Sequence, residues 1–260
     1  MSSVVSYVTP SDYLRAILQR EAVDTSANAP LRALESQLQS LCESWAGRYL
    51  LEVYPTGAYE KGTANQSGSS IDFVVSLSPQ TPFATGQIYE SLLTHLQRSG
   101  FEPERRAVSV GLRVDGAVID VLPAKCESLG SDVHEIYSTR RSAPMKTNLN
   151  HHVLDAIESG RREEIRVLKL WRDQHELDFP SFYLELSTIA ALRRRPLGEL
   201  ADNVWAALGY FEQLFVGRAI LDPANANNVV SAEMRTSEKM VIAAAATATR
   251  GTRSWSEIVV

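Results

Sequence analysis

Cysteine is scarce in this chain: only Cys42 and Cys126 occur among its 260 residues, and they have no CxxC spacing. Disulfide-stapled secreted proteins and structural zinc sites need more cysteines, or cysteines with a more regular spacing. Neither a disulfide nor structural zinc is therefore expected, and we interpret both cysteines as packing residues.

Long apolar runs are also absent from the sequence. None approaches the roughly 20 residues that span a bilayer, and the N-terminal stretch MSSVVSYVTPSDYLRAILQR lacks the basic start and the apolar stretch of a secretion signal. The formal net charge of −5 argues against an extended nucleic-acid face, but it leaves room for a basic patch around a phosphate site. An apolar fraction of 44% is ordinary for a protein with a buried core, so we expect a globular protein. Because the sequence shows neither an apolar run long enough to span a bilayer nor a secretion signal, we also expect a cytoplasmic protein with no membrane partner.

Helical and extended patterns alternate in the first half of the chain. Apolar residues at three- and four-residue spacing predict helices within 10–23 and 30–50, with Ser11 or Asp12 as a candidate cap of the first. A third helix is expected to end at Gly100. Short β-branched segments bounded by turn residues predict strands at 51–57, 71–78, 109–114 and 117–125.

The pair Asp115-Gly116 predicts a two-residue hairpin, because both residues tolerate positive φ angles. From about Asn148 the pattern changes to a helical period and mostly keeps it. We therefore predict an α+β protein with a mixed or antiparallel sheet and flanking helices, followed by a helical domain. Residues 1–140 would form the α/β domain with its N-terminal helices, and residues 141–260 the helical domain.

Carboxylates stand in two of the predicted strands. Residues two apart in a strand share a face, so Ser70 and Asp72 should point the same way. Asp120 lies in a similarly apolar run, where an unpaired carboxylate is costly. Strand pairing could bring Asp72 and Asp120 together, and a divalent cation such as Mg²⁺ or Mn²⁺ would relieve their repulsion. The sequence therefore suggests a site for a metal ion and a nucleotide.

A glycine-containing loop precedes these carboxylates. In TGAYEKGTA, Gly57 and Gly62 let backbone amides approach a phosphate closely, with Lys61 and the Thr63 hydroxyl nearby. Glycine loops are more often plain turns, and a lone acid such as Asp120 more often caps or pairs. It is the combination of loop and acids that indicates phosphate chemistry.

Four segments occur in an order that is more specific than any single motif: GAYEKGTANQSGSSID, VIDVLPAK, IRVLKLWRDQHELDFPSFYLE and LDPANANNVVS. In this order the sequence resembles the polymerase-β-like nucleotidyltransferases, whose pattern is G-S-x-x-x-G-T, then S-D-I-D, then a third acid on a later strand. Within that superfamily it resembles the bacterial anti-phage enzymes related to cyclic-dinucleotide and oligoadenylate synthases. The resemblance covers nearly the whole chain and implies a helical domain that closes a nucleotide cleft.

The resemblance also implies roles for individual residues. The phosphate loop would comprise Gly57, Ala58, Gly62 and Thr63. The three metal-ligand positions would be Ser70, Asp72 and Asp120. Lys169 and Ser181 would contact the donor triphosphate. Without the resemblance, Lys169 could be a solvated helix lysine and Ser181 a helix cap after Pro180. The loop containing Asp222 and Asn225 resembles a segment that folds over the junction of the halves, and we assign it no catalytic role.

Two departures from the family pattern fall in the same site. Ala58 replaces the serine of the phosphate loop, and Ser70 replaces the first aspartate. In a two-metal transfer that aspartate is expected to touch both ions, so Ser70 should lower metal affinity and the activation of the attacking hydroxyl. Glu60 is near enough to be considered as a replacement ligand, but its loop position argues against it, and Asp115 at the hairpin tip is worse placed.

Several other conspicuous side chains have structural interpretations. His151 and His152 are adjacent in a helix and point about 100° apart, which does not suit one metal, so we expect an exposed cap region. Trp171, Trp205 and Tyr210 fall on apolar periods and are predicted core residues.

The sequence leaves more than one function open. The first is an enzyme that uses Mg²⁺ or Mn²⁺ to transfer a nucleotide from a nucleoside triphosphate to a hydroxyl, making a nucleotide signal or short oligonucleotide in bacterial anti-phage defence. The alternative is a catalytically inactive relative that binds a nucleotide or a partner protein encoded nearby, which Ala58 and Ser70 favour. A third is that Ser70 was introduced to trap an inactive state, which would leave Ala58 unexplained.

Overall fold

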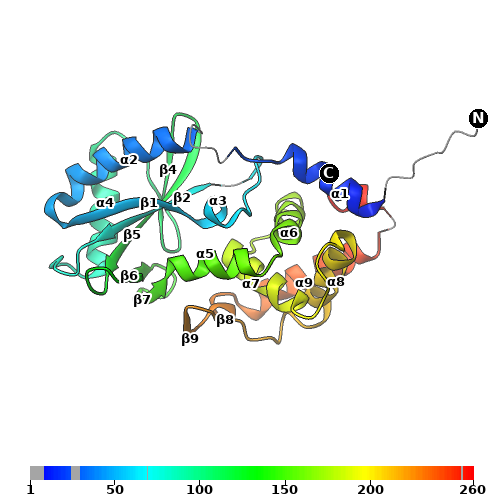
Figure 1. Ribbon diagram of the computed structural model, residues 1–260. Helices are drawn as coiled ribbons and strands as arrows, with labels where there is room; N and C mark the ends of the chain where they lie inside the picture. Colours follow the sequence, from blue (N-terminus) through cyan, green and yellow to red (C-terminus); the bar gives the residue numbers. More distant parts are fainter. Residues whose placement is uncertain (1–8, 25–29, 69, 253) are drawn as a thin grey trace, which may run out of the picture.

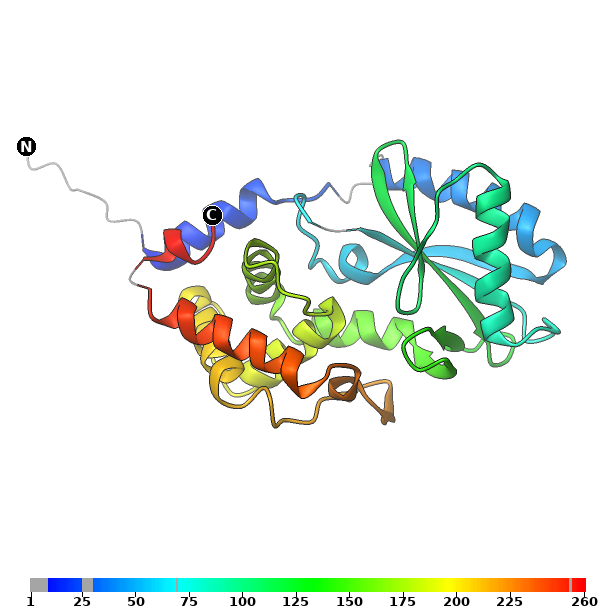
Figure 2. The ribbon, with the colours of Figure 1, turned by 180° about the vertical axis from the view of Figure 1, so that it is seen from behind.

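The computed structural model describes residues 9–24, 30–68, 70–252 and 254–260. The first half of the chain forms a sheet with helices, and helices predominate in the second half (Figure 1). The view from behind shows the two halves side by side, with the C-terminal end next to the first helix (Figure 2). Within the described ranges, no helix is both long and apolar enough to cross a membrane.

A seven-stranded sheet organises the first half. Its strands are β1 (Leu50–Thr56), β2 (Ile71–Leu77), β3 (Glu104–Arg105), β4 (Val110–Val114), β5 (Ala117–Cys126), β6 (Val133–Ser138) and β7 (Ala143–Asn148). The main path runs β1-β2-β5-β4-β3, and β6 and β7 extend it from β5. Strands β2 and β5 are parallel and the other pairs are antiparallel, so the predicted α+β fold with a mixed sheet is confirmed.

Two helices cover one face of the sheet. Helices α2 (Pro30–Ala46) and α4 (Thr85–Arg98) bury their apolar stripes against the inward residues of β2, β4 and β5. Helix α4 is followed by Gly100 with φ +89°, as predicted. The 3₁₀ turn η1 (Gly47–Tyr49) leads into β1, and the short helix α3 (Gly57–Lys61) follows it. A separate, smaller apolar cluster of sheet residues (Val74, Leu122, Ala124 and Ile136) packs against Leu149, where the helical half begins.

The helical half packs around one apolar core. Its elements are α5 (Leu149–Glu158), α6 (Arg162–Gln174), α7 (Ser181–Leu192), α8 (Leu200–Gln213), the hairpin β8 (Leu221–Asp222) and β9 (Asn225–Val229), η2 (Val230–Glu233), α9 (Thr236–Arg250) and η3 (Trp255–Glu257). The predicted core residue Trp171 is fully buried, whereas Trp205 and Tyr210 pack against the core and are only partly buried.

The division of the chain differs in two respects from the predicted one. Strand β7 lies beyond residue 140 and belongs to the sheet, so the helices begin at Leu149, close to the change of period at Asn148. Helix α1 (Pro10–Arg20) was assigned to the α/β domain, but its apolar residues lie in the core of the helical half. Its tyrosine, Tyr13, also donates a hydrogen bond to the Val259 carbonyl at 3.0 Å.

The cap of α1 also differs from the prediction. Thr9, rather than Ser11 or Asp12, is the N-cap: its hydroxyl accepts from the Asp12 amide at 3.1 Å, and the Asp12 carboxylate accepts from the Thr9 amide at 3.3 Å. This reciprocal pair is a capping box. Ser11 instead accepts a hydrogen bond from the Ala201 amide of α8, so it joins α1 to the helical half.

Two other local predictions are confirmed. Asp115 and Gly116 have φ angles of 49° and 83° and connect the antiparallel strands β4 and β5. Cys42 and Cys126 are both buried and free, in keeping with a packing role. Burial raises the pKa of the Cys42 thiol to about 12, which keeps it protonated.

Candidate functional site

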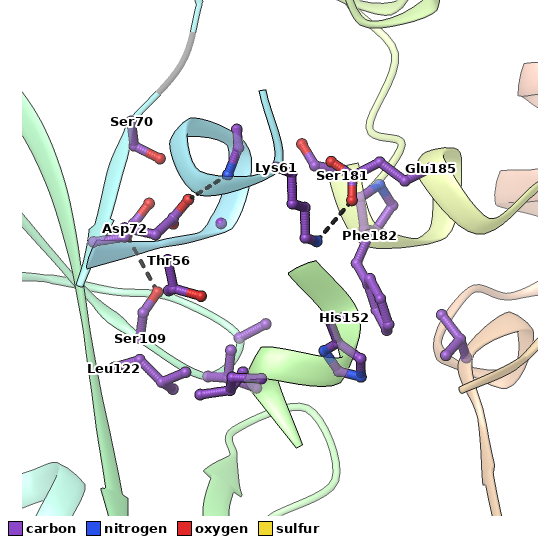
Figure 3. Close-up of a pocket in the computed structure, with 18 of the residues that line it drawn as sticks. Thr56, Lys61, Ser70, Asp72, Ser109, Leu122, His152, Ser181, Phe182 and Glu185 are labelled. Carbon is purple, nitrogen blue, oxygen red and sulfur yellow. Dashed lines mark hydrogen bonds and ion pairs between the residues drawn. The ribbon is translucent and has the colours of Figure 1, made fainter. Parts of the chain in front are cut away.

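A cavity of about 390 Å³ lies between the sheet and the helical half. The predicted site residues that line it are Gly57, Ala58, Lys61, Ser70, Asp72, Asp120, Lys169 and Ser181. Side chains from β1, β2 and the loop before β4 face side chains of α7 across this cavity, which we call the cleft (Figure 3). Gly62 and Thr63 follow α3 in the chain and do not line the cleft.

The two carboxylates are neighbours, as the sequence suggested. Asp72 and Asp120 are Cα partners on the parallel strands β2 and β5, and both face the cleft. Ile71 and Phe73 point the other way, into the core under α2 and α4. Burial of the carboxyl group and repulsion by Asp120 raise the pKa of Asp72 to about 7. Asp72 therefore has too little positive charge beside it to stay fully ionised near neutral pH.

The carboxylate pair fits one divalent cation. Mg²⁺ is commonly held by one or two carboxylates, with water and phosphate oxygens as its other ligands. Ser70, directly before β2, lines the cleft with a neutral hydroxyl. Among the residues that the structure describes, no group of three or more His, Cys, Asp or Glu side chains could hold a metal ion. Neither alternative acid replaces the missing one: Glu60 is exposed and does not line the cleft, and Asp115 accepts a hydrogen bond from Gln37 at the hairpin tip.

The loop before β2 wraps its backbone around Asp72. Gly57 has φ +67°, and a Cβ atom at this position would overlap the Asp72 carboxyl group. The Ala58 amide, in the first turn of α3, points at Asp72 Oδ2 from 3.4 Å. Gly62, also at φ +67°, ends that turn as a left-handed cap. Only glycine allows this approach at residue 57, so the loop and the carboxylate are built as one unit.

Two buried lysines meet one glutamate beside the cleft. Lys61 Nζ lies 2.8 Å from Glu185 Oε2, and Lys169 Nζ lies 2.7 Å from Glu185 Oε1. The Thr63 hydroxyl donates to Glu185 Oε1 at 3.1 Å and accepts from Lys169 Nζ at 3.0 Å. Although burial raises the pKa of Glu185, the two lysines bring it down to about 2. We call Lys61, Thr63, Lys169 and Glu185 the buried ion cluster.

The buried ion cluster decides between two interpretations of Lys169. Its side chain is 4% exposed, so it is not a solvated helix lysine. It contacts Glu185 and both the hydroxyl and the carbonyl of Thr63, which occupies the three hydrogens of an ammonium group. Glu185 itself was missed by the sequence analysis. Its signal was the same as that of Asp120, an acid inside an apolar run, here SFYLELS.

Ser181 is oriented by a second residue that the sequence analysis missed. It is the first residue of α7, but Pro180 is the N-cap and no side chain caps the helix, so the cap interpretation of Ser181 is wrong. Its hydroxyl accepts from Arg172 Nη1 at 2.7 Å. Arg172 also lines the cleft and is held by Asp173 at 2.7 Å. Because Ser181 Oγ accepts from Arg172, its own hydrogen can be donated elsewhere.

The predicted exposed histidine cap holds for His151 only. His151 is exposed, whereas the His152 side chain is 10% exposed and lines the cleft. His152 Nε2 lies 2.7 Å from Asp222 Oδ1, and its ring packs against Phe182 with 4.4 Å between centroids. Asn225 donates to a β7 carbonyl at 3.0 Å, so the loop around β8 and β9 reaches the sheet half as expected.

An apolar floor completes the cleft on the sheet side. It consists of Val108, Leu122, Ile136, Met145 and Leu149. The lining of the cleft therefore combines charged and hydroxyl groups with an apolar surface. Such a lining suits a ligand with an anionic part and a planar or apolar part.

Comparison with known proteins gives matches only at the level of structure. No protein-family model matches the sequence, and no curated protein matches it. Among solved structures, the Bradyrhizobium diazoefficiens CD-NTase CdnG in complex with GTP has a TM-score of 0.74 at 12% identity, covering 93% of this chain and 90% of that one. The E. coli MS115-1 CdnC:HORMA-deltaN complex has a TM-score of 0.71 at 17% identity, covering 92% and 88%. The Cid1 poly(U) polymerase bound to MgATP has a TM-score of 0.64 at 13% identity, covering 94% and 95%.

Proposed function

Because this chain has the fold of the polymerase-β-like nucleotidyltransferases, we propose that it binds a nucleoside triphosphate with a divalent cation in the cleft, and that Ser70 limits nucleotide transfer. One observation carries the proposal: Asp72 and Asp120 are side by side on parallel strands and face the cleft together. A partly buried, repelling pair of carboxylates persists at a cost, and a cation removes that cost.

Different side chains of the cleft would bind different parts of the ligand. Among the residues that the structure describes, Lys61 has one ion-pair partner, Glu185, so its remaining hydrogens can be donated to phosphate oxygens. Ser181 can donate its hydroxyl hydrogen, and Arg172 adds positive charge beside it. Lys169 would have to exchange one of its three contacts to reach a phosphate, so its main role in this proposal is to hold Thr63 and Glu185 in place.

The metal-ion part of the site explains why Ser70 matters. A bound Mg²⁺ would supply activation of an attacking hydroxyl and charge stabilisation at the phosphates. Asp72 and Asp120 would hold it, and Ser70 offers a neutral oxygen where a carboxylate would add a full negative charge. Nucleotide binding tolerates this loss because Lys61, Ser181 and Arg172 contribute independently of the metal. Nucleotide transfer tolerates the missing carboxylate poorly, because the reaction depends on the position of the metal ion.

A second candidate is an active enzyme that makes a nucleotide signal or a short oligonucleotide. The apolar floor favours it, because a second base could lie there while the donor phosphates lie near Lys61. One structural neighbour is described as the Elizabethkingia meningoseptica CdnE cyclic dinucleotide synthase, at 12% identity. By analogy with the CdnC:HORMA-deltaN complex, the proposal then extends to a partner protein. The family resemblance extends it further to bacterial anti-phage defence and to a partner that is encoded nearby.

Pyrophosphate release separates the two candidates. The chain and its Ser70→Asp variant are mixed with Mg²⁺ or Mn²⁺ and each ribo- and deoxyribonucleoside triphosphate, and Asp115→Asn serves as a control at an exposed aspartate. We expect little release from the chain as it stands and a clear gain in Ser70→Asp. Release by the unchanged chain that Asp72→Asn abolishes would favour the active enzyme. If neither the unchanged chain nor Ser70→Asp released pyrophosphate, the result would count against nucleotide transfer in this cleft.

A further inference from the structure

The loop before β4 directs two groups at one oxygen of Asp120. Arg106 Nε lies 3.7 Å from Asp120 Oδ1, and the Ser109 hydroxyl donates to the same oxygen at 3.2 Å. For the other oxygen, Oδ2, the described residues provide no hydrogen bond or ion pair. One side of the carboxylate is thus engaged by the protein.

This loop is held rigidly by buried partners. The hydroxyl of Tyr89, a fully buried residue of α4, lies 3.1 Å from the Arg106 carbonyl and 2.9 Å from the Ser109 carbonyl. The Arg106 amide donates to the same hydroxyl, and the Thr139 hydroxyl donates to the Arg106 carbonyl at 3.0 Å. Tyr89 and Thr139 therefore both hold the backbone that carries Arg106 and Ser109. This backbone position keeps the two side chains close to Asp120.

A glycine makes room for the arginine. Gly111 is the Cα partner of Asp120 across the β4–β5 pair. A Cβ atom at residue 111 would lie 2.8 Å from Arg106 Nε, which is too close for any side chain to fit without displacing the guanidinium. The far end of the guanidinium is anchored by the exposed carboxylate of Glu104 at 2.7 Å. Arg106 lies between two carboxylates, one exposed and one in the cleft wall.

We propose that Arg106, a half-exposed cation beside Asp120 that does not itself line the cleft, partly neutralises this carboxylate and thereby weakens divalent-cation binding at the Asp72–Asp120 pair. This rests on the proposed function, in which that pair holds the metal. A +1 guanidinium beside a +2 ion is repulsive, and the repulsion adds to the loss of charge at Ser70. The site is consequently set for nucleotide binding with a weakly held ion.

Binding of Mn²⁺ alone tests the proposal without any nucleotide. Free Mn²⁺ is followed by electron paramagnetic resonance at low ionic strength, where screening is small. The Ser70→Asp variant, which should bind the ion better than the unchanged chain, is compared with the double variant that also carries Arg106→Gln. We expect Arg106→Gln to tighten Mn²⁺ binding about tenfold, and Arg106→Lys, which keeps the charge, to leave it within about twofold.

Two controls separate charge from structure. Arg105→Gln removes the neighbouring arginine, which pairs with Glu90 away from Asp120, and should leave Mn²⁺ affinity unchanged. Glu104→Gln releases Arg106 from its exposed partner, so it should weaken Mn²⁺ binding, and as an exposed substitution it is not expected to impair folding. Equal Mn²⁺ affinity with Arg and Gln at residue 106 would overturn this proposal alone. Absence of Mn²⁺ binding in every variant, Ser70→Asp included, would overturn the metal site and the proposed function with it.

Discussion

At the scale of single residues, Asp72 is a strongly perturbed group of the cleft. Its pKa is raised to about 7 by burial and by Asp120, so near neutral pH it is only partly ionised. A group whose pKa is higher in the folded protein binds more protons there than in the unfolded chain. Asp72 therefore lowers stability progressively as pH rises from about 4 to about 7, because the unfolded chain releases the proton more easily.

Metal binding should show the opposite pH dependence. A carboxylate must lose its proton to bind a cation, so the stabilisation by Mg²⁺ should grow as pH rises through about 7. We expect a larger Mg²⁺-induced rise in melting temperature at pH 8 than at pH 6, measured by thermal unfolding. In Asp72→Asn the difference between the two pH values should disappear. A rise of equal size at both pH values in the unchanged chain would contradict the assignment.

Gly57 is the second informative residue. Gly57→Ala should lower the free energy of unfolding by more than about 2 kcal/mol, because the new Cβ adds a clash with Asp72 to the strain of a positive φ. Gly116→Ala is the matched control: its φ is +83° and a Cβ would meet nothing within 4 Å. It should cost only about 1 kcal/mol. Urea unfolding of the two variants measures the difference, and equal losses would mean that the contact with Asp72 is unimportant.

At the scale of elements, the buried ion cluster joins α3 to α6 and α7. Removing one partner of a buried ion pair leaves the others uncompensated, and here two lysines depend on one glutamate. Glu185→Gln should therefore lower the free energy of unfolding by about 3 kcal/mol. Glu158→Gln, at an exposed residue near the end of α5, should change it by less than about 0.5 kcal/mol.

The same cluster gives α3 an acid-sensitive anchor. The pKa of Glu185 is held at about 2, below its usual value, so its contribution is complete above about pH 4.5 and is lost as pH falls toward 2. Acid titration of stability should therefore be shallower in Glu185→Gln than in the unchanged chain. Curves of equal steepness would show that Glu185 does not carry this linkage.

At the scale of the whole molecule, the features that could be predicted from the sequence are those that local conformation or strand periodicity determines. The Asp115-Gly116 hairpin, the ending of α4 at Gly100 and the pairing of Asp72 with Asp120 could all be predicted, because each depends on local conformation or on strand periodicity. The register of β2 and β5 then placed both carboxylates on the same face of the sheet.

Other features depend on contacts between distant segments and could not be predicted. Arg172 and Glu185 have ordinary positions in amphipathic or apolar helices, and their roles follow only from how α6 and α7 meet the α3 turn. His152 was predicted to be exposed, because the sequence does not show its contact with Asp222, which lies 70 residues away in the chain. Helix α1 was assigned to the sheet half by its place in the chain, whereas its apolar stripe packs in the other half.

The central claim is that the cleft between the halves binds a nucleoside triphosphate together with a divalent cation. Isothermal titration calorimetry of the full chain with each nucleoside triphosphate, with Mg²⁺ and then with a chelator, tests it most directly. The account predicts saturable one-to-one binding of at least one triphosphate, weakened by the chelator and by Asp72→Asn but not by Glu158→Gln. Absence of binding by the folded chain and by Ser70→Asp, for every triphosphate tested, would contradict it.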